Sequence, residues 1–211
     1  HRLGCRFCLV LVIRSETSTK VRCMTINSLG ALAVLTIRSP DQAARQLLSL
    51  QPGREGLWLA FALAVVLNCL VQLGIDLSVP VPQGQIAPPP ESIPVVLLRS
   101  AGAMLLSILA FFVVGKAIGG KASFDDLMVL TVWLQFLQIV ALVMTLVLSL
   151  TMPFLMMMML FATAILSLYI TLHFLNEAHQ FGSLWKSFAV ILLSALIAVP
   201  FVLYLTPAAP V

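Results

Sequence analysis

Five polar side chains interrupt the long apolar stretches of this chain, and their chemistry limits the functions open to it. They comprise two pairs of amides and one guanidinium: Asn68, Gln72, Arg99, Gln135 and Gln138. The members of each amide pair are three or four residues apart in sequence, so each pair shares one face of a helix. Amides inside a membrane either hydrogen-bond between helices or line a path for a small molecule or lipid. The sequence is compatible with both roles for these amides.

Arg99 lies six residues inside its apolar stretch, about 9 Å along a helix. At this depth the long side chain can reach the outer membrane interface, where Glu91 or Asp76 would supply a counter-charge. Contact with a substrate or ion is the alternative. Ion-coupled transporters and pumps generally use intramembrane carboxylates, and the interiors of these stretches contain none. Ion-coupled transport is therefore not expected.

His173, Glu177 and His179 are the remaining candidates for a metal or catalytic site. His173 and Glu177 share a helix face, but His179 is two residues further on and points away. No other His, Cys or carboxylate lies near in sequence to complete a ligand set. Motifs of zinc proteases, serine hydrolases and phosphate loops are also absent from the sequence. We interpret Glu177 and His179 as part of a polar turn, and we expect no enzyme activity, metal or cofactor.

The apolar stretches that must position these side chains occupy most of the chain. They run over residues 57–74, 93–118, 127–151, 154–175 and 187–206. About 20 residues at about 1.5 Å per residue cross a hydrocarbon core about 30 Å thick. Only 9% of residues are charged, 61% are hydrophobic and the mean hydropathy is +1.08, whereas about a quarter of a soluble domain is charged. The sequence predicts an all-α polytopic integral membrane protein with five transmembrane helices over residues 57–206.

Basic residues lie in alternate gaps between these stretches. The gap after the first stretch contains Asp76 and Glu91 but no Lys or Arg. The segment before the first stretch and the gaps after the second and fourth contain Arg38, Arg45, Arg54, Lys116, Lys121 and Lys186. Because basic residues are retained on the cytoplasmic side during insertion, we expect a cytoplasmic N-terminus and a periplasmic C-terminus, with residues 207–211 as a short tail.

The segment before the first stretch divides into two parts. Residues 1–23 contain five of the twelve basic residues and three of the four cysteines, and we expect them to be translated upstream sequence or an unstructured extension. Residues 24–56 are expected to be cytoplasmic. Within them, Ser39 and Pro40 have the types of a helix cap and first position, which predicts an amphipathic helix over residues 40–50. Its apolar face would lie on the membrane interface or pack on the ends of the spans.

A glycine-containing turn joins the second and third stretches. Gly119 and Gly120 are both free to adopt the positive φ found at helix ends. Ser123 can cap the next helix, and the acidic residues after it are stabilised at a helix N-terminus. This predicts a tight cytoplasmic hairpin made by Gly119, Gly120, Lys121, Ser123, Phe124 and Asp125.

The Gly-Gly-Lys-x-Ser-Phe hairpin resembles that of the Yip (Ypt-interacting protein) domain family. The resemblance extends to five spans, an amphipathic N-terminal segment and a turn that carries Glu177, His179, Phe181 and Ser183, and it covers about residues 38–206. Eukaryotic relatives are non-catalytic proteins of the early secretory pathway that bind prenylated Rab-type GTPases and one another. The cytoplasmic segment here lacks their extended acidic and aromatic region, which puts GTPase binding in doubt. The chain is more similar to the compact bacterial branch, which implies an inner-membrane location.

These observations favour a non-enzymatic membrane scaffold or organiser. Membrane lipid and a membrane-protein partner or second copy are the expected partners, and nucleic acid is not. Small and amide-bearing residues, including Gly102, Ala103 and Ser107, would support helix association. The alternative is a small-molecule or lipid transporter that uses the polar residues of the first three spans.

Overall fold

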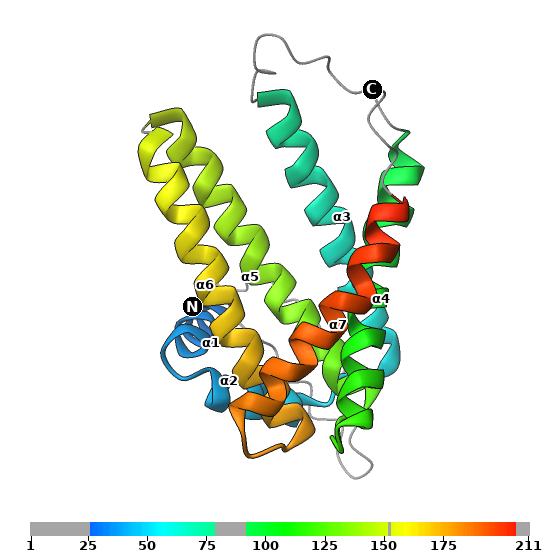
Figure 1. Ribbon diagram of the computed structural model, residues 1–211. Coiled ribbons are helices and arrows are strands. Elements are labelled where there is room, and N and C mark those ends of the chain that lie inside the picture. The colour runs from blue at the N-terminus through cyan, green and yellow to red at the C-terminus, as the bar shows by residue number, and fades with distance from the viewer. Residues whose placement is uncertain (1–25, 79–91, 152, 206–211) are drawn as a thin grey trace, which may run out of the picture.

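A computed structural model describes residues 26–78, 92–151 and 153–205, and within them all regular structure is helical (Figure 1). The residues predicted to be an N-terminal extension, 1–23, and the tail, 207–211, lie outside the described residues. Two short helices precede five long ones. Their bounds are α1 Ile26–Arg38, α2 Pro40–Leu50, α3 Arg54–Ser78, α4 Ile93–Ala117, α5 Phe124–Thr151, α6 Pro153–His179 and α7 Leu184–Leu205.

Four of the described helices are long and apolar enough to cross a membrane. The qualifying segments are Arg54–Gly74, Ile93–Ala117, Phe124–Leu148 and Met157–His179. The apolar segments Leu184–Pro200 in α7 and Ser28–Arg38 in α1 are shorter. The predicted all-helical class is therefore confirmed, with four spans supported by length and composition in the part of the chain described.

The five long helices form a ring whose order differs from their order in the sequence. Around the ring, α3 contacts α5, α5 contacts α6, α6 contacts α7, α7 contacts α4, and α4 returns to α3. In addition α4 contacts α5 across the ring. Sequence neighbours α4 and α5 are thus joined by a short turn, but α5 lies between α3 and α6 (Figure 1).

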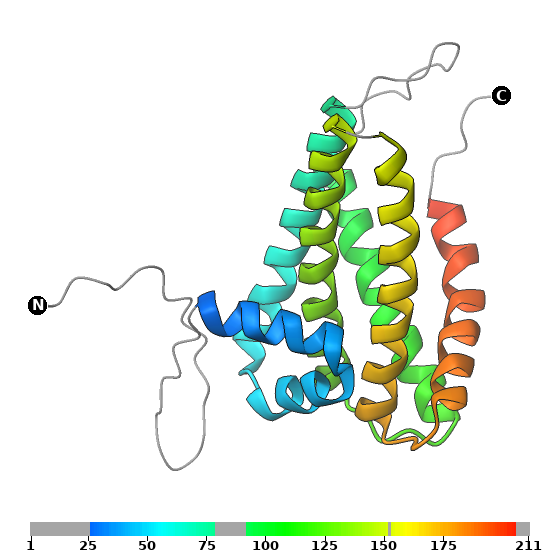
Figure 2. The same cartoon turned by 90° about the vertical axis from the view of Figure 1, so that its left-hand side faces the viewer.

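One end of the ring carries the α4–α5 turn, the α6–α7 turn and most of the charged side chains; we refer to it as the charged end. It contains the α4–α5 and α6–α7 turns together with Lys116, Lys121, Asp125, Glu177 and Lys186. α1 and α2 lie beside this end, with α1 crossing the direction of the long helices (Figure 2). α2 contacts both α5 and α6, and α1 contacts α2 and α6.

The predicted helix over residues 40–50 forms with those bounds as α2. Its apolar face is buried against protein: Ala43 and Ala44 are fully buried and Leu47 is nearly so. This face was predicted either to lie on the membrane interface or to pack on the ends of the spans. The contacts of α2 with α5 and α6 agree with packing on the long helices. The predicted side-chain cap is wrong: Ser39 is at the N-cap position of α2, but its hydroxyl accepts no capping hydrogen bond from a backbone N–H.

The outer surface of the ring is apolar, as contact with lipid requires. Leu98, Ile165 and Leu196 are 76%, 70% and 65% exposed, which a water-soluble protein of this size rarely tolerates over many neighbouring residues. Trp58 and Trp185 are also exposed and lie near the starts of α3 and α7 at the charged end. Tryptophan is enriched at membrane–water interfaces, so this end is suited to the edge of the bilayer.

Candidate functional site

The glycine-containing turn between α4 and α5 is closed by backbone hydrogen bonds. The amide of Gly120 donates to the Gly115 carbonyl at 2.8 Å and that of Gly119 donates to the Lys116 carbonyl at 3.0 Å. These two bonds form a Schellman motif, in which the residue after the helix adopts a left-handed conformation. Gly119 has that conformation, with φ of 93°. Gly120 does not have a positive φ, so the expectation that both glycines serve the backbone in this way is wrong for Gly120.

The start of α5 is capped from both directions. The Asp126 amide donates to the Ser123 hydroxyl at 3.1 Å, and the Ser123 amide donates to the Asp126 carboxylate at 3.0 Å. This reciprocal arrangement satisfies two helix N–H groups and places a carboxylate at the positive helix end. Phe124 packs edge-on against Phe112 of α4, with ring centroids 6.3 Å apart. The hairpin is therefore held by its cap and by an aromatic contact.

Gly120 is needed because the ring of His179 occupies the space beside it. A Cβ atom on Gly120 would lie 2.1 Å from the His179 Nδ1, and one on Gly115 would lie 2.1 Å from its Cε1. The Lys121 amide also donates to the His179 carbonyl at 3.1 Å. The end of α6 is thus pressed against the α4–α5 turn, and we call this contact of Gly115, Gly120, Lys121 and His179 the glycine–histidine contact.

His179 is almost completely buried, at 1% exposure, which contradicts its interpretation as part of a polar, solvated turn. Its ring stacks on Phe181 with centroids 4.9 Å apart and planes inclined by 14°. Within the described residues neither ring nitrogen has a hydrogen-bond partner. The imidazole acts here as a flat packing element between two glycines and an aromatic ring.

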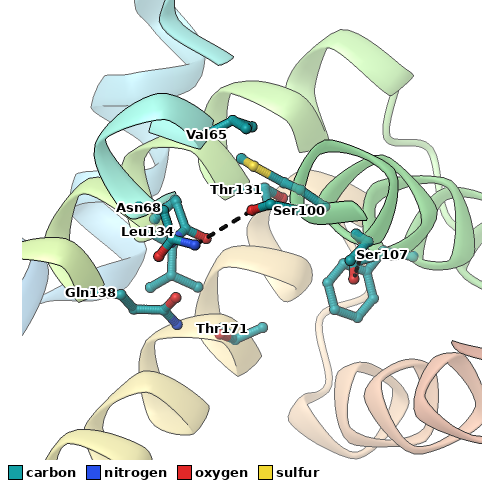
Figure 3. Close-up of a pocket in the computed structure, with 12 residues that line it drawn as sticks. Val65, Asn68, Ser100, Ser107, Thr131, Leu134, Gln138 and Thr171 are labelled. Carbon is teal, nitrogen blue, oxygen red and sulfur yellow. Dashed lines mark hydrogen bonds between the residues drawn. The ribbon is translucent and has the colours of Figure 1, made fainter. Parts of the chain in front are cut away.

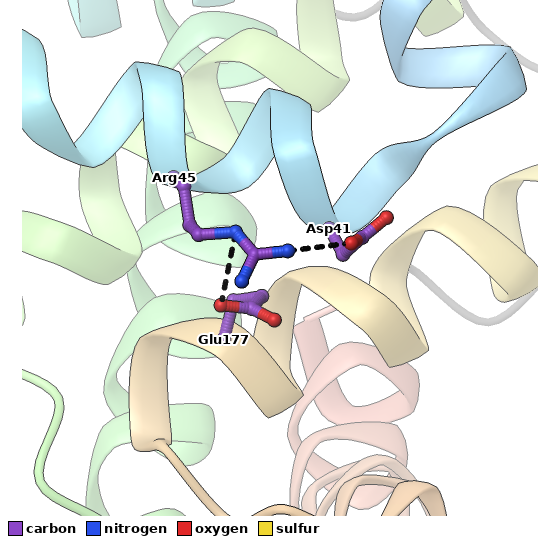
Figure 4. A network of polar contacts seen from close by, with 3 residues as sticks. All are labelled: Asp41, Arg45 and Glu177. Carbon is purple, nitrogen blue, oxygen red and sulfur yellow. Dashed lines mark hydrogen bonds and ion pairs between the residues drawn. The ribbon is translucent and has the colours of Figure 1, made fainter.

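The other two members of the His-Glu-His set have separate partners. His173 packs edge-on against Tyr169, with ring centroids 4.7 Å apart. The Glu177 carboxylate lies 3.8 Å from the guanidinium of Arg45, which also pairs with Asp41 at 2.6 Å (Figure 4). Over residues 26–78, 92–151 and 153–205, no three His, Cys, Asp or Glu side chains are grouped to hold a metal ion.

The ion pair of Arg45 with Glu177 connects α2 to α6, and a second ion pair connects the start of α3 to the start of α5. In that pair the Arg54 guanidinium lies 3.5 Å from the Asp125 carboxylate. Arg45 and Arg54 side chains are 60% and 83% exposed, so each pair contributes at most about 1 kcal/mol. The buried apolar face of α2 must therefore provide most of its attachment.

Three of the five predicted intramembrane polar residues come together inside the ring (Figure 3). The Gln135 amide of α5 donates to the Asn68 carbonyl oxygen of α3 at 3.2 Å, and the Asn68 amide donates to the Ser100 hydroxyl of α4 at 3.5 Å. Gln138 donates to the Ser167 hydroxyl of α6 at 2.9 Å. Such bonds between membrane helices contribute about 0.6 kcal/mol each, and together they link α3, α4, α5 and α6.

These amides also line a cavity of about 390 Å³. Four helices of the ring contribute to it, through Val65, Asn68, Ser100, Ala103, Met104, Ser107, Phe111, Thr131, Leu134, Gln135, Gln138 and Thr171. Most of these side chains are only partly buried, so the cavity is open to its surroundings. Its wall combines amide and hydroxyl groups with apolar side chains.

Gln72 and Arg99 do not line the cavity. Gln72 is exposed although it lies one turn from Asn68, and Arg99 is half-buried beside Ser100 in sequence. The hydroxyl partners Ser100 and Ser167 were not predicted, because a helical serine commonly bonds to its own backbone and gives no sign of an interhelical role. Gly102 faces open space, whereas its neighbour Ala103 lines the cavity.

The fold, the glycine–histidine contact and the polar cavity define a helical membrane protein. Its polar groups form contacts between helices and at one end of the ring. The sequence model of the Yip1 domain matches residues 34–205, which is most of the chain. The chain therefore belongs to the Yip1 domain family, and the predicted resemblance is confirmed. Neither the search of curated proteins nor that of solved structures found a match.

Proposed function

We propose that this Yip1-family protein is a non-enzymatic scaffold or organiser that crosses the inner membrane five times. The charged end would face the cytoplasm, because basic side chains are retained there, and α7 would return the chain to the periplasmic side. Membrane lipid and a membrane-protein partner or second copy are its proposed ligands. Neither nucleic acid nor a small GTPase is proposed as a partner.

The observation that carries this proposal is the attachment of α2 to α5 and α6 beside the charged end. Ala43, Ala44 and Leu47 of α2 are buried, and α2 contacts α1, α5 and α6. The glycine–histidine contact holds the adjoining turns together at the same end. Together these contacts hold the helices in one arrangement at the charged end, as a scaffold requires.

The positions of the acidic residues support the same proposal. In helices α3 to α7, each acidic residue lies within three residues of a helix end: Glu55, Asp76, Asp125, Asp126 and Glu177. Proton and ion relays generally place carboxylates deep in the membrane. The second candidate function, transport of a small molecule or lipid, is favoured by the polar cavity between α3, α4, α5 and α6.

Capture of the tagged full chain from membranes in a mild detergent tests the scaffold proposal. Two differently tagged copies are expressed together, and an unrelated helical membrane protein with the same tags is the control. A scaffold predicts that a membrane protein or the second copy co-elutes in a fixed ratio and survives dilution. Elution of the chain alone as a monomer, with specific uptake of a solute in proteoliposomes, would contradict the proposal and support transport.

A further inference from the structure

The cavity inside the ring has the dimensions and lining of a binding site. Sites for small molecules generally measure about 300–1,000 Å³ and combine apolar walls with a few polar groups, and this one measures about 390 Å³. Because most of its lining residues are partly exposed, the cavity is not a sealed packing defect. The cavity lies deep along the long helices. Asn68 and Gln138 are each fourteen residues from the start of their helices at the charged end, which is about 21 Å along each axis.

The amides of the cavity have hydrogen-bonding capacity that their mutual contacts do not use. A side-chain amide has two N–H donors and a carbonyl that accepts two bonds. Asn68 donates one bond and accepts one, and Gln135 and Gln138 each donate one. In a hydrocarbon surrounding, unused polar groups are costly unless water or a ligand meets them. The cavity therefore favours an occupant that both donates and accepts hydrogen bonds.

The lining also specifies the charge of that occupant. Among its twelve residues none is charged, and Arg99, the nearest basic residue in sequence, is not one of them. An anionic or cationic group would enter without a counter-charge, which is strongly unfavourable in a medium of low dielectric constant. The apolar side chains of Val65, Met104, Leu134 and Phe111 would contact a hydrocarbon portion.

We infer that the cavity binds an uncharged, hydroxyl-bearing group, with the amides of Asn68, Gln135 and Gln138 meeting its hydroxyls. A neutral lipid with a glycerol head has this chemistry, and a free polyol shares its hydrogen-bonding part. This site is independent of the proposed scaffold function, because a ring that holds a partner can also hold a lipid.

The experiment uses the full chain in nanodiscs with a dioleoylglycerol probe that carries a photoactivatable diazirine in one acyl chain. Labelling of the wild type should saturate with probe concentration. Ala103→Leu places a larger side chain in the cavity and should reduce labelling at least tenfold. Gly102→Leu is the matched control, because the adjacent residue faces open space, and it should label like the wild type.

A second pair of variants covers the case in which Ala103→Leu does not fold, as judged by size-exclusion profile and melting temperature. Gln135→Met removes an amide from the cavity while keeping a similar shape, and Gln72→Met makes the same change one turn from Asn68 and outside the lining. Labelling should fall at least threefold in the first variant alone.

Competition distinguishes the possible sources of the ligand. Displacement by unlabelled dioleoylglycerol but not by glycerol supports the site and assigns it to a lipid, and equal displacement by glycerol supports it and assigns it to a free polyol. Displacement by anionic dioleoylphosphatidic acid, which has no uncharged hydroxyl-bearing head, as strong as by the neutral lipid would overturn the inference. Equal labelling of Ala103→Leu and Gly102→Leu, or unsaturable labelling of the wild type, would do so too.

Discussion

At the scale of single residues, the glycine–histidine contact explains why two glycines flank the α4–α5 turn. The turn itself and its Ser123 cap follow from local sequence, and both form. The need for space beside Gly120 could not be predicted, because the side chain that fills it, His179, is 59 residues later in the sequence. A local pattern indicates how the backbone turns but not which distant side chain lies against it.

The first prediction concerns Gly120→Ala. The added Cβ would lie 2.1 Å from the His179 Nδ1 and 2.8 Å from the Gly115 carbonyl oxygen. Since His179 is buried, neither group can move freely, and overpacking of this kind costs about 1–3 kcal/mol. A lower melting temperature in detergent is expected. Gly102→Ala is the control: its Cβ meets nothing within 4 Å and should stabilise α4 by about 0.5–1 kcal/mol.

Combining Gly120→Ala with His179→Ala provides a second, independent prediction. His179→Ala alone should destabilise the protein by about 2 kcal/mol or more, because it leaves a cavity beside two glycines. With the ring absent, the Gly120 Cβ has room, so the double variant should be at least about 0.5 kcal/mol more stable than the sum of the single effects. Additive losses would show that the two residues do not interact.

At the scale of helices, the short helix α2 could be predicted from its sequence, whereas the short helix α1 could not. The helix α2 was predicted from Ser39 and Pro40 at its start, and its amphipathic pattern indicated which side would be buried. α1 was not predicted, because its apolar residues are spread around the helix: Val34 and Ile37 are about half exposed while Leu32 is buried. Its place depends on contacts with α2 and α6 and on a hydrogen bond to α5, which no local pattern contains.

For α2, we predict that Ala44→Arg detaches the helix and that Gln46→Arg does not. Ala44 is fully buried, whereas Gln46 is exposed two residues later. An arginine at the first site would place an unpaired charge in an apolar contact. Hydrogen exchange of the α2 amides should be at least tenfold faster in Ala44→Arg and unchanged in Gln46→Arg. Equal protection in both variants would mean that α2 does not pack as described.

For α1, the testable contact is the hydrogen bond from the Trp133 indole of α5 to the Thr36 hydroxyl, at 3.0 Å. Thr36 is fully buried, so Thr36→Val leaves the indole N–H without that acceptor and should cost about 1–3 kcal/mol. Thr163→Val is the control, because the Thr163 hydroxyl donates to the Met159 carbonyl of its own helix. A similar change in melting temperature for both variants would contradict the role of this contact.

At the scale of the whole molecule, hydropathy predicts the long helices but not their order in the ring. The five long helices are apolar on most sides, so their sequences do not indicate which face meets which neighbour. The contact of Asn68 with Gln135 joins residues 67 apart, and it depends on α3 lying beside α5. The cavity arises from that arrangement, which explains why only part of its lining was anticipated.

The central claim is tested by measuring on which side of the membrane each end of α7 lies. A five-crossing scaffold must place these two ends on opposite sides. With the four native cysteines replaced by alanine, Ser92→Cys, Lys186→Cys and a cysteine added after the C-terminus are each treated with a membrane-impermeant maleimide in spheroplasts. We predict labelling at Ser92→Cys and at the C-terminus, and labelling of Lys186→Cys only after the membrane is permeabilised. Labelling of Lys186→Cys in sealed spheroplasts, or protection of the C-terminal cysteine, would contradict five crossings with the charged end in the cytoplasm.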